Sequence, residues 1–260
     1  MRRETGFLEH DGERIYWESA GEGPALVLTH GAGGNHAAWF QQIPVFAKTR
    51  RVIAWDQRGF GRSTARGGAN SPERAARDLA ALLDALGVER ADLVGQSMGG
   101  WAVLGFALAH PERTRSLVLA DTPGGIDTKE LRAQWADVGP GGFATDELGR
   151  HPALAADFFE RHPERAVLYQ QLGGFGEPEL AKILPSLVQT RLGADALTEL
   201  RCPVLLIVGE QDALFPPAVM RASAGLLPNA RLALIPHAGH SPYFEEPEAW
   251  NRAVAEFLGK

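Results

Sequence analysis

The stretch Leu93-Val94-Gly95-Gln96-Ser97-Met98-Gly99-Gly100 decides the fold. Apolar residues run into a Gly-x-Ser-x-Gly pentapeptide, and a helical pattern follows it. This order is typical of a strand that passes a serine to a helix through a sharp turn, which holds the serine in a strained backbone conformation with its hydroxyl exposed. A Cβ at Gly95 or Gly99 would collide with the neighbouring strand or helix. Ser97 is therefore a candidate nucleophile, although a structural Gly-rich turn can share the pattern.

Composition narrows the class of protein. The 260 residues are enough for one large domain or one domain with a substantial insertion. The net charge of −6, without a run of like charge, argues against nucleic acid and anionic membranes as partners. A single cysteine, Cys202, excludes an internal disulfide and is expected in the core. We find no secretory signal and no apolar stretch long enough to cross a bilayer, so we expect a cytoplasmic protein.

Short apolar runs alternate with amphipathic stretches along the chain. A proline follows Ser71 at the start of one helical pattern, and Gly87 ends it. Further helices are expected over Met98–His110 and Glu248–Leu258. Eight segments are expected as strands, the first two as a hairpin across Asp11-Gly12 and the last six as buried strands: Gly6–Glu9, Arg14–Ser19, Ala25–Thr29, Val52–Trp55, Asp92–Gly95, Ser116–Ala120, Val204–Val208 and Leu232–Ile235. The alternation predicts a mostly parallel, doubly wound α/β sheet with flanking helices.

The segment 122–199 departs from this alternation. It has few β-branched runs, and large apolar residues recur at helical intervals: Trp135, Phe143, Phe158, Phe159, Tyr169 and Phe175. We expect a helical insertion after the sixth strand, at the edge where open α/β sheets bind ligands. Residues 1–121 and 200–260 would form the core, and 122–199 either a lid over the site or a second packing layer.

A serine nucleophile needs a histidine base and an acid that orients it. Asp212 follows the predicted strand Val204–Val208, and His240 follows the next one. His240 is favoured over His237, which lies nearer the end of its strand. Asp212 is favoured over Asp121, which ends an earlier strand at the same edge. The chain order Ser97, Asp212, His240, with each residue after a strand, predicts that all three meet at one edge of the sheet.

An oxyanion hole needs two backbone N–H groups. We expect one from Met98, directly after the nucleophile, and one from Ala32 in the glycine-rich loop after Ala25–Thr29, with Gly31 and Gly33 as alternatives. The glycines of this loop would let the backbone approach a substrate, so Gly31 and Gly33 are also candidate binding residues. His30 is expected to hydrogen-bond the loop. Three aromatic residues outside segment 122–199, and the aromatic residues within it, could line an acyl pocket or belong to the core; the three are Trp39, Trp101 and Phe215.

Five segments together resemble the signature segments of the α/β-hydrolase superfamily. They are His30-Gly-Ala-Gly-Gly34, Asp56-Gln-Arg-Gly-Phe-Gly-Arg-Ser63, Gly95-Gln-Ser-Met-Gly-Gly100, Gly209-Glu-Gln-Asp212 and Gly239-His-Ser241. The resemblance implies the α/β-hydrolase fold with eight strands, and a structural role for Asp56 and Arg58. Within the superfamily, Ser97 excludes the enzymes with an aspartate nucleophile. Gln96 stands where meta-cleavage C–C hydrolases usually carry asparagine.

The sequence thus predicts a serine hydrolase that cleaves a small-molecule carboxylic ester or lactone through an acyl-enzyme on Ser97, with no cofactor and no metal. One alternative is a C–C bond hydrolase of a vinylogous diketone acid, which would require a pocket arginine such as Arg191. Another is a slow-turnover ligand receptor on the same scaffold. The substrate and the oligomeric state are not given by the sequence.

Overall fold

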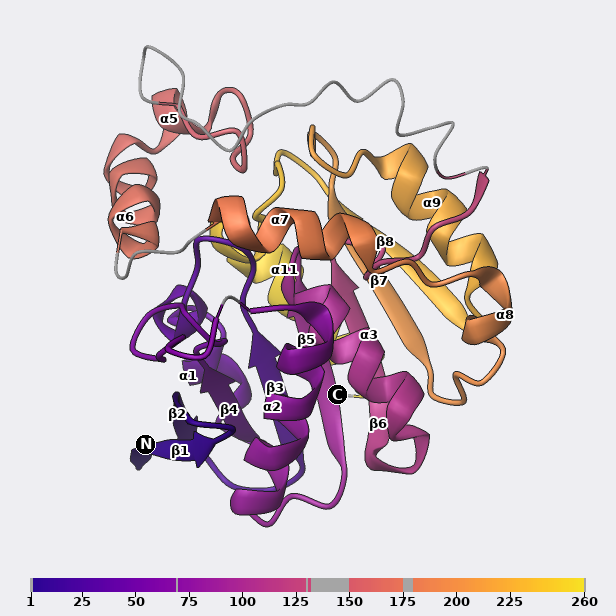
Figure 1. Ribbon diagram of the computed structural model, residues 1–260. Helices are drawn as coiled ribbons and strands as arrows, with labels where there is room; N and C mark the ends of the chain where they lie inside the picture. Colours follow the sequence, from indigo (N-terminus) through magenta and orange to yellow (C-terminus); the bar gives the residue numbers. More distant parts are fainter. Residues whose placement is uncertain (1, 69, 130, 132–149, 175–179, 260) are drawn as a thin grey trace.

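The computed structural model describes residues 2–68, 70–129, 131, 150–174 and 180–259. Its centre is one eight-stranded sheet with the order β1-β2-β4-β3-β5-β6-β7-β8 (Figure 1). The strands are β1 (Arg3–His10), β2 (Glu13–Ala20), β3 (Ala25–Thr29), β4 (Arg51–Trp55), β5 (Ala91–Gln96), β6 (Thr114–Ala120), β7 (Val204–Gly209) and β8 (Ala230–Ile235). Strand β2 pairs antiparallel with β1 and with β4, whereas all other neighbours are parallel. The predicted fold class is confirmed.

The ends of the sheet explain two details of the sequence. The hairpin of β1 and β2 turns at Asp11 and Gly12, both with positive φ, as the two-residue turn requires. Strand β8 was predicted as fully buried, but it is an edge strand with several partly exposed residues, and 43% of Leu234 is exposed. An apolar run therefore does not distinguish an edge strand from a central one.

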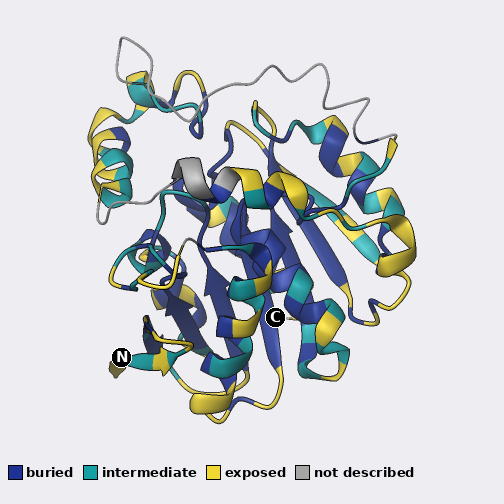
Figure 2. Ribbon diagram, in the orientation of Figure 1, coloured by how far each residue is buried: buried dark blue, intermediate teal, exposed yellow. Residues whose placement is uncertain are grey.

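Each central strand sends alternate side chains to opposite faces of the sheet, as the two-residue period of a strand requires. In β5, Leu93 joins one buried cluster and Val94 the other. Figure 2 shows the central strands buried almost throughout. The first cluster packs under α2 (Pro72–Ala85), α3 (Gly99–Ala109) and α9 (Pro217–Leu226). The second packs under α1 (Ile43–Phe46), α10 (Pro242–Glu245), α11 (Pro247–Phe257) and the 3-10 helix η1 (His36–Trp39).

Helix α2 begins and ends as its sequence predicts. The Ser71 hydroxyl accepts a hydrogen bond from Arg74 N–H at 3.2 Å, and Pro72 occupies the first turn. Gly87, with φ of +64°, follows its end. A second 3-10 helix, η2 (Pro111–Arg113), connects α3 to β6.

The described part of segment 122–199, here called the insertion, contains helices α5 (Phe158–Arg161), α6 (Pro163–Gly173), α7 (Leu180–Gln189) and α8 (Ala194–Leu197), and no strand of the sheet. Its two ends meet at a parallel bridge between Ile126 and Leu192. In Figure 1, α5, α6 and α7 lie at the edge where the parallel strands end. Phe158 is fully buried there. Trp135, Phe143 and Phe175 lie outside the described residues. Across the described ranges, we find no helix with the length and apolarity of a membrane span.

Candidate active site

Ser97 occupies the turn between β5 and α3 with a φ of +48°, which is rare for a residue with a side chain. Its N–H donates to the carbonyl of Ala120 at 2.9 Å. A Cβ on Gly95 would lie 2.5 Å from Gly99 O, and one on Gly99 would lie 2.4 Å from Thr29 O, so neither position tolerates a side chain. Taken as a whole residue, Ser97 is buried, with 6% of its surface exposed.

His240 and Asp212 form the one direct histidine–carboxylate contact beside Ser97 in the described residues. His240 Nδ1 donates to Asp212 Oδ2 at 2.9 Å. The other oxygen of Asp212 accepts the N–H groups of Leu214 and Phe215 at 2.8 and 3.0 Å, which favours its ionised form. The ring of Phe215 stacks on the imidazole with centroids 5.5 Å apart. His240 Nε2 is buried and has no hydrogen-bond partner among the described groups.

The turn that carries His240 is fixed from two sides. Gln96 Nε2 donates to the carbonyl of His240 at 2.9 Å. One carboxylate oxygen of Glu245 accepts the N–H groups of Gly239 and Ser241 at 2.9 and 3.2 Å. The other oxygen of Glu245 accepts Ala155 N–H of the insertion at 2.7 Å. Burial raises the pKa of Glu245 to about 7 despite these three bonds.

The insertion contacts this turn at a second point. Tyr169 of α6 shares a 2.8 Å hydrogen bond with the Ser241 hydroxyl. Burial raises the pKa of Tyr169 to about 12. A Cβ on Gly239 would lie 2.5 Å from Ala155 N, so the turn and the insertion are in close backbone contact. The roles of Glu245 and Tyr169 at this turn were not predicted from sequence; an acidic residue that follows Pro-Tyr-Phe, five residues after the histidine, was the available clue for Glu245.

The loop after β3 lies against the serine. A Cβ on Gly31 would be 3.0 Å from Ser97 Cβ and 2.1 Å from Gln96 Oε1. Neither Ala32 N–H nor Met98 N–H has a protein acceptor within the described ranges. Both are thus available as donors near Ser97, as an oxyanion hole requires. Gly33, with φ of +76°, has open space around its Cα.

His30 holds this loop, as predicted. Its Nε2 accepts Gln57 N–H at 3.0 Å, and its Nδ1 donates to Gly31 O at 2.7 Å, so the imidazole is neutral. Burial lowers its pKa, consistent with that tautomer. Asp56 and Arg58 also have structural partners. Asp56 accepts His36 Nδ1 at 2.8 Å, and Arg58 Nε and Nη2 donate to the two oxygens of Asp78 at 2.8 and 2.6 Å.

The two rival residues are placed differently from the favoured ones. His237 is exposed, with φ of +60°. Asp121 is fully buried at the end of β6, where its Oδ1 accepts Gly209 N–H at 3.0 Å. Side-chain atoms of Asp121, Asp212 and His240 lie within 4.8 Å of one another, a spacing that could suit a metal ion. However, Asp212 already accepts three N–H groups, including His240 Nδ1, so this donor set does not fit a metal site.

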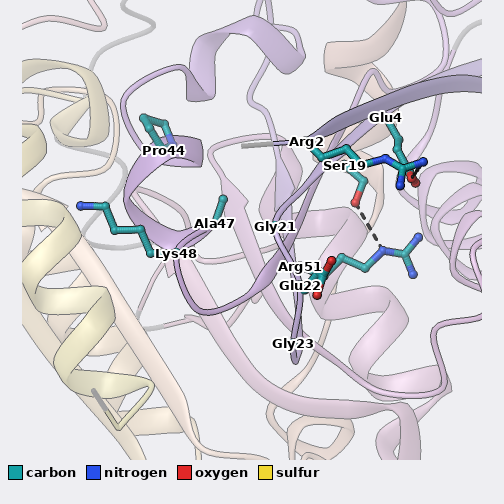
Figure 3. A pocket seen from close by; sticks show the side chains of 10 residues that line it. All are labelled: Arg2, Glu4, Ser19, Gly21, Glu22, Gly23, Pro44, Ala47, Lys48 and Arg51. Atoms are coloured by element: carbon teal, nitrogen blue, oxygen red, sulfur yellow. Dashed lines mark hydrogen bonds and ion pairs between the residues drawn. The ribbon is translucent and has the colours of Figure 1, made fainter.

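Beside this edge of the sheet, described residues line two neighbouring cavities. One, of about 380 Å³, is lined by Ala32, Gly33 and residues of α6 and α10, including Tyr169 and Tyr243. The other, of about 430 Å³, lies between the insertion and the Asp212 loop. His151 and Gln170 line both cavities. A larger cavity of about 790 Å³ lies away from Ser97, and the charged side chains that line it are Arg2, Glu4, Glu22, Lys48 and Arg51 (Figure 3).

The three predicted aromatic residues have different surroundings. Trp39 is fully buried against Tyr243 and Trp250, so it belongs to the core. Trp101 lies one helical turn beyond Ser97, and its ring faces Phe215 at 6.4 Å between centroids. Arg191, expected in the pocket of a C–C hydrolase, is 53% exposed and forms an ion pair with Asp127 at 3.2 Å.

Comparison with known proteins assigns the family. A model of the alpha/beta hydrolase family matches residues 26–253. The chain belongs to this family. It is 32% identical to "Putative carbamate hydrolase RutD" of Caulobacter sp. (strain K31), covering 98% of both chains. It is 31% identical to the 2-hydroxy-6-oxononadienedioate/2-hydroxy-6-oxononatrienedioate hydrolase of Burkholderia vietnamiensis (strain G4), covering 94% of this chain and 91% of the relative.

A solved structure resembles this hydrolase over nearly its whole length. The thermophilic esterase of Thermogutta terrifontis matches it with a TM-score of 0.83 and 32% identity, over 99% of this chain and 98% of the esterase. The similar proteins carry names for several reactions, namely hydrolysis of carbamates, of an oxo-dienedioate and of esters. The family membership therefore establishes that the protein is a hydrolase. The kind of bond that it cleaves has to be inferred from the site.

Proposed function

We propose that this hydrolase cleaves a neutral carboxylic ester or lactone by acyl transfer to water. The observation that supports this best is the buried Nε2 of His240, which has no partner among the described groups, while the opposite ring nitrogen is held by Asp212. Such an imidazole can accept a proton, and Asp212 stabilises the imidazolium that forms. Ser97 is the nucleophile in this proposal, because the turn after β5 holds it in a strained conformation at the same edge.

In the first step, Ser97 Oγ attacks the carbonyl carbon while His240 Nε2 takes the hydroxyl proton. The N–H groups of Met98 and Ala32 stabilise the oxyanion. The alcohol then leaves with the proton from His240, and an acyl-enzyme remains on Ser97. Water attacks the acyl-enzyme with His240 as base, which releases the acid and restores the serine.

The substrate group that enters beside Ala32 and Gly33 is uncharged in this proposal. The described residues that line this 380 Å³ cavity include no lysine, arginine, aspartate or glutamate. The insertion, residues 122–199, acts as the lid that selects the substrate, and residues 1–121 and 200–260 form the catalytic core. Gly31, Gly33, Trp101 and Phe215 are the proposed substrate-binding residues.

A carbamate is the second candidate substrate, because it has the same attacked carbonyl and several relatives carry that name. The C–C hydrolase alternative has less support. Its acidic substrate needs a cationic partner, and the predicted one, Arg191, is paired with Asp127 at the surface. A receptor with slow turnover differs from an enzyme in kinetics, since it would give a burst without a steady state.

The test is replacement of the nucleophile. Ser97→Ala should lower kcat for a p-nitrophenyl ester by about 10⁶-fold, as loss of a serine nucleophile does elsewhere. Ser223→Ala is the control, because Ser223 is buried in α9 and donates only to Val219 O. A fluorophosphonate should label Ser97 in the wild type. If Ser97→Ala keeps most of the activity, or the label falls on another residue, the proposed nucleophile is wrong. A panel of esters, lactones, carbamates and diketone acids then identifies the bond.

A further inference from the structure

Asp121 has no task in the proposed reaction, yet it is fully buried beside the histidine and its acid. Its side chain lies within 4.8 Å of the ligand atoms of Asp212 and His240. Its Oδ1 accepts Gly209 N–H, whereas its Oδ2 is buried without a hydrogen-bond partner among the described groups. Its backbone adopts φ of +52°, an unfavourable conformation for most residues. A buried carboxylate oxygen without a donor is costly, so this atom requires explanation.

Two adjacent buried carboxyl groups cannot both be ionised at low cost unless a cation lies between them. In the described ranges, neither Asp121 nor Asp212 forms an ion pair with lysine or arginine, and the one histidine partner is His240. One of the two acids therefore holds a proton. Asp212 accepts three N–H groups, which stabilise its ionised form, whereas Asp121 accepts one. The proton belongs on Asp121.

We infer that Asp121 is a positioning residue for the proposed catalytic triad: a neutral carboxylic acid whose Oδ2–H donates to Asp212. This inference rests on the proposed function for its catalytic consequence. Asp212 then receives four donors, which fill its lone-pair sites and hold it facing His240 Nδ1.

The surroundings of Asp121 agree with a neutral acid. Burial is the largest cause that raises the pKa of Asp121 well above its usual value, and the negative charge of Asp212 is the second. The titratable groups that influence or contact it are Asp212, His240, Glu245, Tyr169 and Tyr243. Among them the two tyrosines stay neutral well into the alkaline range, because burial raises both of their pKa values.

Asp121→Asn tests the inference without disturbing the backbone. Asparagine tolerates positive φ, its amide N–H₂ can donate to Asp212, and its carbonyl can accept Gly209 N–H. We expect kcat within about threefold of the wild type at neutral pH, because the donor to Asp212 is kept. Asp212→Asn should instead lose about 10⁴-fold, as replacement of a triad aspartate does elsewhere. If Asp121→Asn loses as much as Asp212→Asn, Asp121 is itself the acid that serves the histidine and the inference is overturned.

The pH profile supplies a measurement that a purely structural role would not change. In the wild type, ionisation of Asp121 at alkaline pH removes the donor and places a second negative charge beside Asp212, so kcat should fall. Asp121→Asn cannot ionise, so its kcat should not show this fall. An identical alkaline fall in both proteins would overturn the inference.

Infrared difference spectroscopy tests the protonation state without reference to activity. At about pH 8.5, above the pKa of Glu245, the wild type should retain the carbonyl stretch of a protonated carboxylic acid, and Asp121→Asn should lack it. If the band is absent from the wild type or persists in the variant, Asp121 is not the proton holder. If the band behaves as expected but Ser97→Ala keeps esterase activity, the proposed function fails while the assignment of the proton stands.

Discussion

Replacement of Glu245 by glutamine removes a buried charge at the contact between the insertion and the histidine turn. Burial raises the pKa of Glu245 from 4.5 to about 7, so the folded protein binds this proton more tightly than the unfolded chain does. The stabilisation is fully present below about pH 4.5 and is lost as pH rises towards 7. At 1.36 kcal/mol for each pKa unit, the loss is about 3 kcal/mol. Glu245→Gln cannot titrate and lacks this dependence.

The assay is the free energy of unfolding from urea titrations of both proteins between about pH 5 and pH 8. Other groups titrate in both proteins and cancel in the difference. The stability of Glu245→Gln relative to the wild type should therefore increase by about 2.5 kcal/mol over this range, since the remainder of the loss lies below pH 5. At every pH the variant should also be less stable by a constant amount of about 1–3 kcal/mol, because the glutamine N–H₂ faces Ala155 N–H and two donors then meet without an acceptor.

Glu246→Gln is the matched control. Glu246 is the next residue, is about one-third exposed and pairs with Arg161 at 3.4 Å, so its replacement should cost at most about 1 kcal/mol. A stability difference between the wild type and Glu245→Gln that stays constant from about pH 5 to pH 8 would refute the reasoning, because it would show that Glu245 does not hold an extra proton in the folded state.

Two further substitutions test close contacts described above. Gly31→Ala should reduce kcat by about 10²–10³-fold, comparable to the loss of one oxyanion donor, because the added Cβ would meet Gln96 Oε1 and Ser97 Cβ. Steady-state kinetics, with an unchanged melting temperature, would show this loss. An unchanged kcat would contradict it. Asp78→Asn should destabilise the protein by about 3–5 kcal/mol, because it removes the buried charge partner of Arg58 and leaves only the exposed Asp11 at 3.6 Å; a urea midpoint near that of the wild type would exclude the effect.

The sheet could be predicted because parallel strands buried on both faces are continuous apolar runs, and the glycines around Ser97 allow one geometry. Gly95 and Gly99 have the close backbone neighbours that the sequence implies. The edge position of β8 could not be predicted, because the apolar residues of Ala230–Ile235 resemble those of a central strand. Local pattern determines strand formation, whereas exposure depends on which neighbours are present.

The favoured pair His240 and Asp212 follows from chain order, and the structure places the two in hydrogen-bond contact. Chain order could not reveal how close the side chain of Asp121 lies to Asp212 and His240, because this distance depends on the register of β6 against β7. The surroundings of Arg191, which the C–C hydrolase alternative would require in the pocket, could not be predicted for a similar reason. Its charge was evident from sequence, but its surface partner Asp127 depends on how the ends of the insertion meet.

The two ends of the insertion lie side by side, so another segment could replace it without a change in the sheet. Leu192 N–H donates to Gly125 O at 2.9 Å, and Asp127 N–H donates to Leu192 O at 3.0 Å, so the segment leaves and re-enters the core at one point. A different segment joined at this neck would not need to alter any strand. It would need to replace the contacts that the insertion makes with the core, among them the N–H that Ala155 donates to Glu245, the hydroxyl that Tyr169 shares with Ser241 and the guanidinium that Arg161 donates to His237 O. If the insertion selects the substrate as proposed, substrate range can evolve by replacement of one contiguous piece of the gene without a change in the strands that carry Ser97, Asp212 and His240.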